Sequence, residues 1–181
     1  SLWENTRMDC HAQNIYTVAG TGVAGYSGDG GFSTSAQLNL PAGVAIDGSG
    51  NIFIADKANH SVRKVDATTG IISTVAGTGV AGYSGNGGAA TSAQLNEPFG
   101  IVSDASGNIF IADRNNHSIR KVDATTGIIS MVAGTGTGGY GGDGGAATSA
   151  QLNTPVGVAF DGLGNLFIAD GANHRIRKVN N

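Results

Sequence analysis

The sequence predicts an all-β protein built from repeated four-stranded antiparallel sheets, and two observations support this prediction. An almost uninterrupted apolar run of strand length, residues 51–56, returns at residues 108–113 and 165–170. A run of six residues has the length of a strand, and apolar residues without alternation are typical of a strand that is covered on both faces. Prolines recur at a constant interval of 57 residues (98 − 41 and 155 − 98), and this interval indicates a propeller, a solenoid or another repeat array.

The composition favours a folded chain and argues against two classes of partner. Gly accounts for 31 of 181 residues, far above its usual share of about 7%, but disordered chains lack such periodic runs of Ile, Val and Phe. The 10 basic and 13 acidic residues give a net charge of −3 and are spread over every copy. The basic stripe of a nucleic-acid-binding protein is therefore missing, and no apolar run approaches the roughly 18 residues that suggest a membrane span.

The chain begins with a segment, residues 1–13, that matches no part of the repeat. This segment holds Cys10, the only cysteine, so an intramolecular disulfide is impossible. We interpret Cys10 as a free thiol rather than as half of an intermolecular disulfide. The tail is compatible with a leader, a dimer arm or a fragment of a replaced blade, and the repeats occupy residues 14–181.

One complete unit starts at Pro41, at a position where a strand tolerates proline because no ladder N–H is needed. Its four predicted strands are residues 43–47, 51–56, 61–66 and 71–76. The Asp-Gly pair that starts at Asp47 is a strong hairpin signal between the first two strands. Four short antiparallel strands joined by tight turns make one blade of a β-propeller.

A long glycine-rich connection, residues 77–97, links the outer strand of one unit to the inner strand of the next. Loops of this length are functional, or compact and packed on themselves. We expect one helical turn within residues 89–95. The expected anchors of the three loops are the tyrosines and leucines that repeat in them: Tyr26, Tyr83, Tyr140, Leu38, Leu95 and Leu152.

With these motifs in place, the unit resembles the NHL repeat, named for its Asn-His-Leu signature. The corresponding positions here are 59–61, 116–118 and 173–175, with Ser or Arg in place of Leu. The Tyr-x-Gly-x-Gly-Gly insertion resembles a bacterial and cell-surface subset, which favours an extracellular or periplasmic location. The resemblance covers everything after about residue 14 and implies a β-propeller, commonly of six blades, that serves mainly as a binding surface. A few relatives among other propellers are lyases or lactonases.

Three units are fewer than the four to eight blades with which propellers close. The third unit stops after its third strand, whereas residues 15–20 match the outer strands of the other units and are predicted to be a strand. We therefore predict a homodimer formed by strand exchange, in which each N-terminal strand completes the partner's third blade and six blades close around a two-fold axis. The alternative is that the chain is a fragment of a longer array.

The Asp-x-x-Asn-His motif after the second strand has both a structural and a chemical interpretation. Asp and His are common catalytic and metal-binding residues, but Asx side chains also bond the free backbone groups of turns. We favour the structural interpretation and expect the three repeated arginines, Arg63, Arg120 and Arg177, to pair with these aspartates or with a neighbouring blade. No catalytic residues are predicted, because Cys10 lies outside the repeats and no serine stands in a Gly-x-Ser-x-Gly elbow.

Two sets of residues are candidate metal ligands. Asp29 and Asp143 lie at equivalent positions of Gly-rich loops of the kind that can hold Ca²⁺. Asn86 takes the same position in the loop between them. Their spacing matches neither an EF-hand nor a nonapeptide repeat, so turn chemistry is the favoured interpretation and no cofactor is predicted, with Ca²⁺ as the alternative. The second set precedes the inner strands, where side chains can ring a central channel or cap the strand entry: Asn39, Asn96 and Asn153.

The turn after the second strand and the long connections should emerge on one face, and the copies differ mostly there. Such variation is expected where loops carry function on a rigid scaffold. Our leading hypothesis is a non-enzymatic binding or scaffolding module for a protein or glycan ligand. The candidate contacts are Tyr26, Tyr83, Tyr140, Lys57, Arg114, Asn59, Asn116, Asn173, His60, His117 and His174.

Two other functions remain as alternatives. The first is a metal-assisted lyase or hydrolase with a cation in the central channel; three near-equal copies argue against it, because catalysis usually needs different residues at one site. The second is a structural repeat whose surface serves assembly alone.

Overall fold

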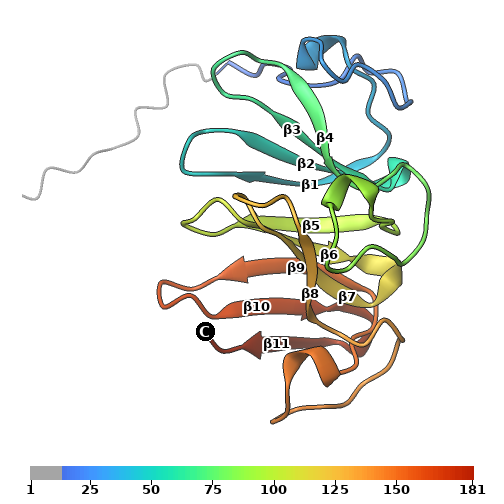
Figure 1. Ribbon diagram of the computed structural model, residues 1–181, viewed down its shortest axis with the longest axis vertical. Helices are drawn as coiled ribbons and strands as arrows, with labels where there is room; N and C mark the ends of the chain where they lie inside the picture. Colours follow the sequence, from blue (N-terminus) through green and yellow to red (C-terminus); the bar gives the residue numbers. More distant parts are fainter. Residues whose placement is uncertain (1–13) are drawn as a thin grey trace, which may run out of the picture.

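The computed structural model describes residues 14–181, and these residues form three antiparallel sheets (Figure 1). The first sheet runs in the order β1 (Pro41–Ile46), β2 (Ile52–Asp56), β3 (Ser61–Val65) and β4 (Ile72–Ala76). The second repeats this order with β5 (Pro98–Ser103), β6 (Ile109–Asp113), β7 (Ser118–Val122) and β8 (Ile129–Ala133). The third consists of β9 (Pro155–Phe160), β10 (Leu166–Asp170) and β11 (Arg175–Val179). The predicted four-stranded unit is thus confirmed, with its inner strand beginning at the proline itself.

Six short 3-10 turns recur between the strands of the described chain. Three follow the second strand of each sheet: η2 (Lys57–Asn59), η4 (Arg114–Asn116) and η6 (Gly171–Asn173). The other three lie in the long connections: η1 (Ser33–Ser35), η3 (Ala90–Ser92) and η5 (Ala147–Ser149). The helical turn expected within residues 89–95 is therefore present as η3. No helix in residues 14–181 is long and apolar enough to cross a membrane.

The turn between the first two strands of each sheet is fixed by an Asp-Asn pair. Asp47 Oδ1 accepts the N–H groups of Ser49 and Asn51, each at 2.9 Å, while Asn51 Nδ2 donates to Asp47 Oδ2 at 2.8 Å. Asn51 Oδ1 also accepts the N–H of Ala67 at 3.0 Å, which ties this turn to the next hairpin. These side chains explain why the same turn recurs at a fixed register in every sheet.

The sheets pack face to face along the long axis of the molecule, as blades do (Figure 1). The buried side chains of Phe53, Ala55 and Val62 belong to one core cluster with Ile109 and Ile111 of the next sheet. A second cluster repeats this arrangement between the second and third sheets. Each fully buried large apolar side chain contributes roughly 1.5–3 kcal/mol, so these interfaces stabilise the stack.

The inner strands β1, β5 and β9 approach one another at glycines. A Cβ atom on Gly43 would collide with the carbonyl oxygen of Phe99, and one on Gly100 would lie 2.6 Å from the carbonyl oxygen of Val156. Backbone therefore faces backbone at the centre of the stack, where no side chain fits.

Residues 14–20 form no strand in the single chain, although a strand was expected at residues 15–20. Ile15 is 97% exposed and Tyr16 is exposed as well. The physical reason is the lack of a partner strand, because Figure 1 shows this segment at the opposite end of the stack from β11. The predictions for the N-terminal tail and for Cys10 lie outside the described residues.

Candidate binding face

A buried carboxylate holds the turn after the second strand of each blade. In the first blade, both side-chain oxygens of Asp56 are engaged: Oδ1 accepts the Asn39 N–H at 2.7 Å, and Oδ2 accepts the Asn59 side chain at 2.8 Å. Asn59 Nδ2 also donates to the carbonyl oxygen of Gly25, at 2.7 Å, in the long loop. These bonds bring the turn and the long loop together on one side of the molecule. We call this side the loop face and define it as residues 57–60, 114–117 and 171–174 with the loops 20–40, 77–97 and 134–154.

The signature histidines connect one blade to the next. All three adopt left-handed backbone, with φ of 48° at His60, 49° at His117 and 53° at His174. His60 Nδ1 accepts the N–H of Glu97 at 3.2 Å, and His117 Nδ1 accepts the N–H of Thr154 at 3.1 Å. A ring nitrogen used in this way orients a neighbouring loop, which fits the structural interpretation of the motif.

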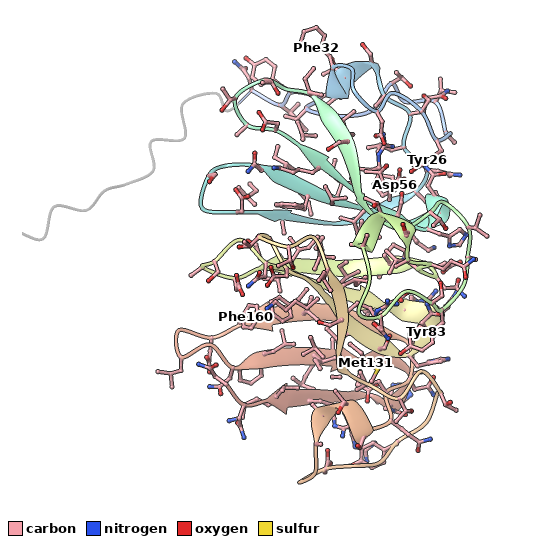
Figure 2. All side chains as sticks on the ribbon, in the orientation of Figure 1. Tyr26, Phe32, Asp56, Tyr83, Met131 and Phe160 are labelled. Carbon is pink, nitrogen blue, oxygen red and sulfur yellow. The ribbon has the colours of Figure 1, made fainter. Side chains whose placement is uncertain are left out.

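Each repeated arginine lies against a tyrosine ring, and Arg63 and Arg120 are fully buried. Arg63 pairs with Asp29 and Asp56, and its guanidinium carbon lies 5.0 Å from the centre of the Tyr26 ring. The Tyr26 hydroxyl is hydrogen-bonded to Thr74 Oγ1 at 2.8 Å. The same stacking joins Arg120 to Tyr83 and Arg177 to Tyr140. The expected pairing of arginine with aspartate is confirmed, and the tyrosines contribute to the scaffold as well as to the loop face (Figure 2).

The Asp29 and Asp143 side chains, the candidate calcium ligands, are bonded to protein groups. Asp29 forms an ion pair with Arg63, and Asp143 with Arg177. Burial raises the pKa of Asp29, but hydrogen bonds from Thr74 and Arg63 outweigh it and leave the pKa below its ordinary value. Within residues 14–181, no three His, Cys, Asp or Glu side chains are close enough together to hold a metal ion.

The second blade lacks one of these carboxylates, because Asn86 stands where the other loops have aspartate. Arg120 still pairs with Asp113 at 3.3 Å, but its buried Nε finds no acceptor in the described chain. Burial raises the pKa of Asp113 to about 6, against the opposing effect of hydrogen bonds from Asn116, Asn96 and Arg120. The buried arginine of this blade therefore has one carboxylate partner, Asp113, whereas Arg63 of the first blade has two.

The three asparagines before the inner strands use their backbone to fix the strand entry. The N–H groups of Asn39, Asn96 and Asn153 each donate to the buried aspartate of their own blade at 2.7 Å. Their carbonyl oxygens accept N–H groups from the turns η2, η4 and η6. This geometry agrees with the capping interpretation of these residues.

One acidic residue bridges two blades on the loop face. Glu97 lies 2.7 Å from Arg114 Nη1 and 3.7 Å from Lys57 Nζ. The Arg114 guanidinium also lies over the Phe99 ring, at 6.0 Å. Lys57 and Arg114 are among the candidate contacts predicted from the sequence, whereas Glu97 is not.

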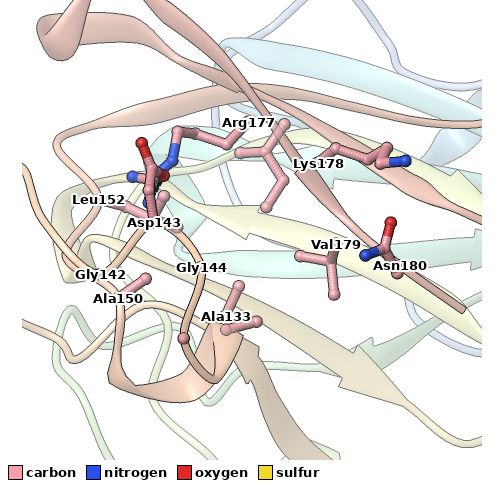
Figure 3. A pocket seen from close by; sticks show the side chains of 13 residues that line it. Ala133, Gly142, Asp143, Gly144, Ala150, Leu152, Arg177, Lys178, Val179 and Asn180 are labelled. Atoms are coloured by element: carbon pink, nitrogen blue, oxygen red, sulfur yellow. Dashed lines mark ion pairs between the residues drawn. The ribbon is translucent and has the colours of Figure 1, made fainter.

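A cavity of about 340 Å³ lies beside β11, at the end of the stack (Figure 3). Gly144, Gly145 and Leu152 of the long loop line one side, while Arg177 and Val179 of β11 line the other. This cavity could not be predicted from the sequence, since its walls come from the long loop and from two strands that follow it in the chain.

The chain matches two protein-family models. The model of the teneurin NHL domain matches residues 6–84 and 80–140, and the model of the NHL repeat matches residues 152–179. NHL repeat-containing protein 2 of Bos taurus is 36% identical over 103 residues, covering 56% of this chain and 14% of its own length. The chain spans about a tenth of the length of the curated relatives it matches.

Two solved structures from Bacteroides thetaiotaomicron are similar over most of the chain. One, described as a structural genomics protein of unknown function, has a TM-score of 0.69 at 25% identity, covering 81% of this chain and 37% of its own. The other is described as an auxiliary nutrient binding protein. It has a TM-score of 0.60 at 27% identity and covers 75% of this chain and 36% of its own.

Proposed function

This chain belongs to the NHL repeat family, and on that premise we propose that it is a non-enzymatic binding or scaffolding module that holds a protein ligand on its loop face. The proposal rests on one observation. Equivalent backbone positions on the loop face carry chemically different side chains in the three blades, while the strands beneath them repeat almost unchanged. A rigid scaffold with variable loops is the usual architecture of a recognition surface.

The residue before each inner-strand proline is the central element of this surface. Leu40, Glu97 and Thr154 all have left-handed backbone, with φ of 50°, 52° and 47°. Such values are uncommon for residues other than glycine, and residues held in sparsely populated conformations cluster at ligand sites. The histidine of the preceding blade fixes two of these positions, Glu97 and Thr154, through their N–H groups.

The chemistry of these positions favours a protein ligand over a glycan. The first blade presents the exposed Leu40, the second presents the Glu97–Arg114 ion pair, and the third presents Thr154. Exposed apolar side chains together with charged and polar ones are typical of protein interfaces. A sugar would need the tyrosine rings as platforms, and each ring is already stacked against a guanidinium on one face.

The structure offers less support for an enzyme. The carboxylates of the Asp-x-x-Asn-His motifs are bonded within the scaffold, as are the rings of His60 and His117. A catalytic site would instead need different residues converging on one place in different roles.

The proposal is tested by selecting a displayed library of random 12-residue peptides on the full chain. Peptides that bind with micromolar Kd should lose at least tenfold in affinity for Leu40→Asp, a change of about 1.4 kcal/mol. Leu163→Asp is the matched control, because Leu163 is also exposed but lies in the β9–β10 turn, on the side of the stack away from the long loops.

Three outcomes would contradict the proposal. Equal binding to the wild type and to both variants would remove the ligand from the loop face. Binding on a glycan array, where peptide selection fails, would identify a sugar ligand instead. Hydrolysis of ester or lactone probes that a chelator abolishes would favour the enzymatic alternative.

A further inference from the structure

A carboxylate of the long loop caps the repeated arginine in two of the three blades. In the first blade, Asp29 Oδ1 accepts hydrogen bonds from two nitrogens of Arg63, Nε at 3.1 Å and Nη2. Asp29 Oδ2 accepts the N–H of Thr74 at 3.0 Å. In the third blade Asp143 takes the same place, and its Oδ1 lies 2.6 Å from Arg177 Nη2 (Figure 3). Each of these blades thus supplies its own carboxylate.

The second blade keeps the donors but lacks the carboxylate. Asn86 stands in the place of the aspartate, and the buried Nε of Arg120 has no acceptor among residues 14–181. Arg120 Nη2 donates to the carbonyl oxygen of Ser84 at 3.0 Å, whereas Arg63 Nη2 donates to the equivalent carbonyl and to the aspartate as well. The N–H of Met131, opposite Arg120 in the sheet, corresponds to the one that the first blade bonds to its aspartate. Three donors therefore surround a place that this loop leaves without a carboxylate.

The side chain of Asn86 is a poor substitute for a carboxylate. A carboxylate presents acceptor oxygens alone, whereas a side-chain amide presents one oxygen and one NH₂ donor. In the place of Asp29, an amide would set its NH₂ group against one of the surrounding N–H donors. This opposition explains why the exposed Asn86 forms no hydrogen bond with Arg120 in the described chain.

The tyrosine beside this place offers a further donor. The Tyr83 ring centre lies 5.3 Å from the guanidinium carbon of Arg120. The Tyr83 hydroxyl donates to Met131 Sδ at 3.1 Å (Figure 2), and a thioether sulfur is a weak acceptor. In the third blade the equivalent hydroxyl, that of Tyr140, donates to Asp143 Oδ2 at 2.8 Å. A carboxylate next to Arg120 would give the Tyr83 hydroxyl the same stronger acceptor.

The place is also reachable from solvent. The side chains of Asp29 and Asp143, which fill it in the other blades, are 46% and 62% exposed. The loop of the second blade keeps the same backbone, since the glycines on either side of Asn86 have φ of 86° and 84°, against 91° and 83° beside Asp29. A carboxylate can therefore enter once the exposed Asn86 side chain turns aside.

We propose that the second blade holds a carboxylate-binding site, in which Arg120, Tyr83 and the N–H of Met131 bind a carboxylate that the blade's own loop does not supply. The edge of a guanidinium formed by Nε and Nη2 matches the two oxygens of a carboxylate. The carboxylate belongs either to a small free acid or to an Asp or Glu side chain of a polypeptide on the loop face. The second source rests on the proposed function, whereas the first does not.

The first experiment measures the stability of the full chain in sodium formate, a small carboxylate, by urea denaturation in chloride-free buffer near pH 7. A ligand that binds only the folded chain multiplies the folding equilibrium constant by one plus the ratio of its concentration to its Kd. With a Kd of about 25 mM, about 100 mM formate should raise this constant about fivefold in the wild type. Asn86→Asp is the matched control, because its own carboxylate fills the place and only the general effect of salt should remain.

Asp29→Asn provides the converse test. It removes the carboxylate of the first blade and should create a second site at Arg63, so formate should raise its folding equilibrium constant by about a further fivefold. If Asp29→Asn does not fold, the comparison of the wild type with Asn86→Asp decides. A wild type that formate leaves unchanged would overturn the proposal, as would an equal gain in the wild type and Asn86→Asp.

The second experiment identifies the source of the carboxylate. Each peptide selected on the loop face is also prepared with its Asp and Glu residues changed to Asn and Gln. A loss of about tenfold in affinity for the wild type, with little loss for Asn86→Asp, identifies an acidic side chain of a polypeptide. Equal affinities, in a chain that formate stabilises, identify a free acid. A chain that binds no peptide but responds to formate would remove the loop-face function and keep the carboxylate site.

Discussion

Burial in the second blade disfavours the ionised form of Asp113. Its carboxyl group is fully buried, and burial raises its pKa to about 6 from an ordinary value of 3.8. The folded protein therefore binds this proton more tightly than the unfolded chain does. The stabilising contribution of the protonated group is complete below the unfolded pKa and is lost as the pH rises through the folded pKa.

We therefore expect the free energy of unfolding to fall between about pH 4 and pH 6, by up to roughly 3 kcal/mol. Urea denaturation across this range measures the change. Asp113→Asn is the control, since it removes the titrating group and should flatten the profile. Stability that rises over the same range in the wild type would contradict this prediction.

Arg120 gives a second prediction at the scale of single residues. Its buried Nε atom has no acceptor among residues 14–181, whereas the equivalent Nε of Arg63 donates to Asp29 at 3.1 Å. Asn86→Asp would supply the missing carboxylate, and we expect it to stabilise the chain by about 1 kcal/mol, since a partly exposed charged hydrogen bond contributes less than a buried one.

Chemical denaturation near pH 7 measures the effect of Asn86→Asp. The reverse substitution in the first blade, Asp29→Asn, should destabilise by a similar amount. An Asn86→Asp variant no more stable than the wild type would show that the buried Nε has other partners in solution.

The close packing of the inner strands limits which residues they can carry. Gly100 of β5 lies so close to the backbone of β9 that Gly100→Ala must push the strands apart. We expect a loss of about 1–3 kcal/mol, as for other overpacked sites. Gly48→Ala is the matched control, because a Cβ there has no atom within 4 Å. Thermal unfolding of both variants measures the difference, and equal midpoints would show that the strands can separate without loss.

Most of the elements could be predicted from the sequence, because strand length, turn chemistry and the repeat interval are local signals. The turn built by Asp47 and Asn51 is an example. The segment at residues 15–20 was predicted to be a strand but forms none in the single chain, since a strand requires a neighbour that this chain does not provide.

The candidate site was harder to predict, because its geometry depends on distant contacts. Arg63 meets Asp29 across 34 positions, and His60 meets Glu97 across 37. The sequence identified most of these residue types as noteworthy, but not which partner each would bind. For the same reason the tyrosines could be named as exposed aromatics, while their stacking on arginines could not be foreseen.

At the scale of the whole molecule, stability and ligand binding should be linked. A ligand that binds only the folded chain stabilises it by mass action, so the thermal midpoint rises with ligand concentration. We expect a peptide that binds the loop face to stabilise the wild type by about 2.7 kcal/mol at a hundred times its Kd, and to stabilise Leu40→Asp less. Calorimetry at several peptide concentrations makes this comparison, and an equal rise for both chains would indicate that the peptide does not contact Leu40.

The histidine contact between blades also has a consequence for heredity. Because His60 and His117 join their neighbours through the same atoms at the same 57-residue spacing, duplicating one unit of the gene would insert a blade whose two junctions already fit. Such a gene can gain or lose whole units while every junction keeps the same contacts. Selection would then act on the number of blades, because only some numbers close a ring.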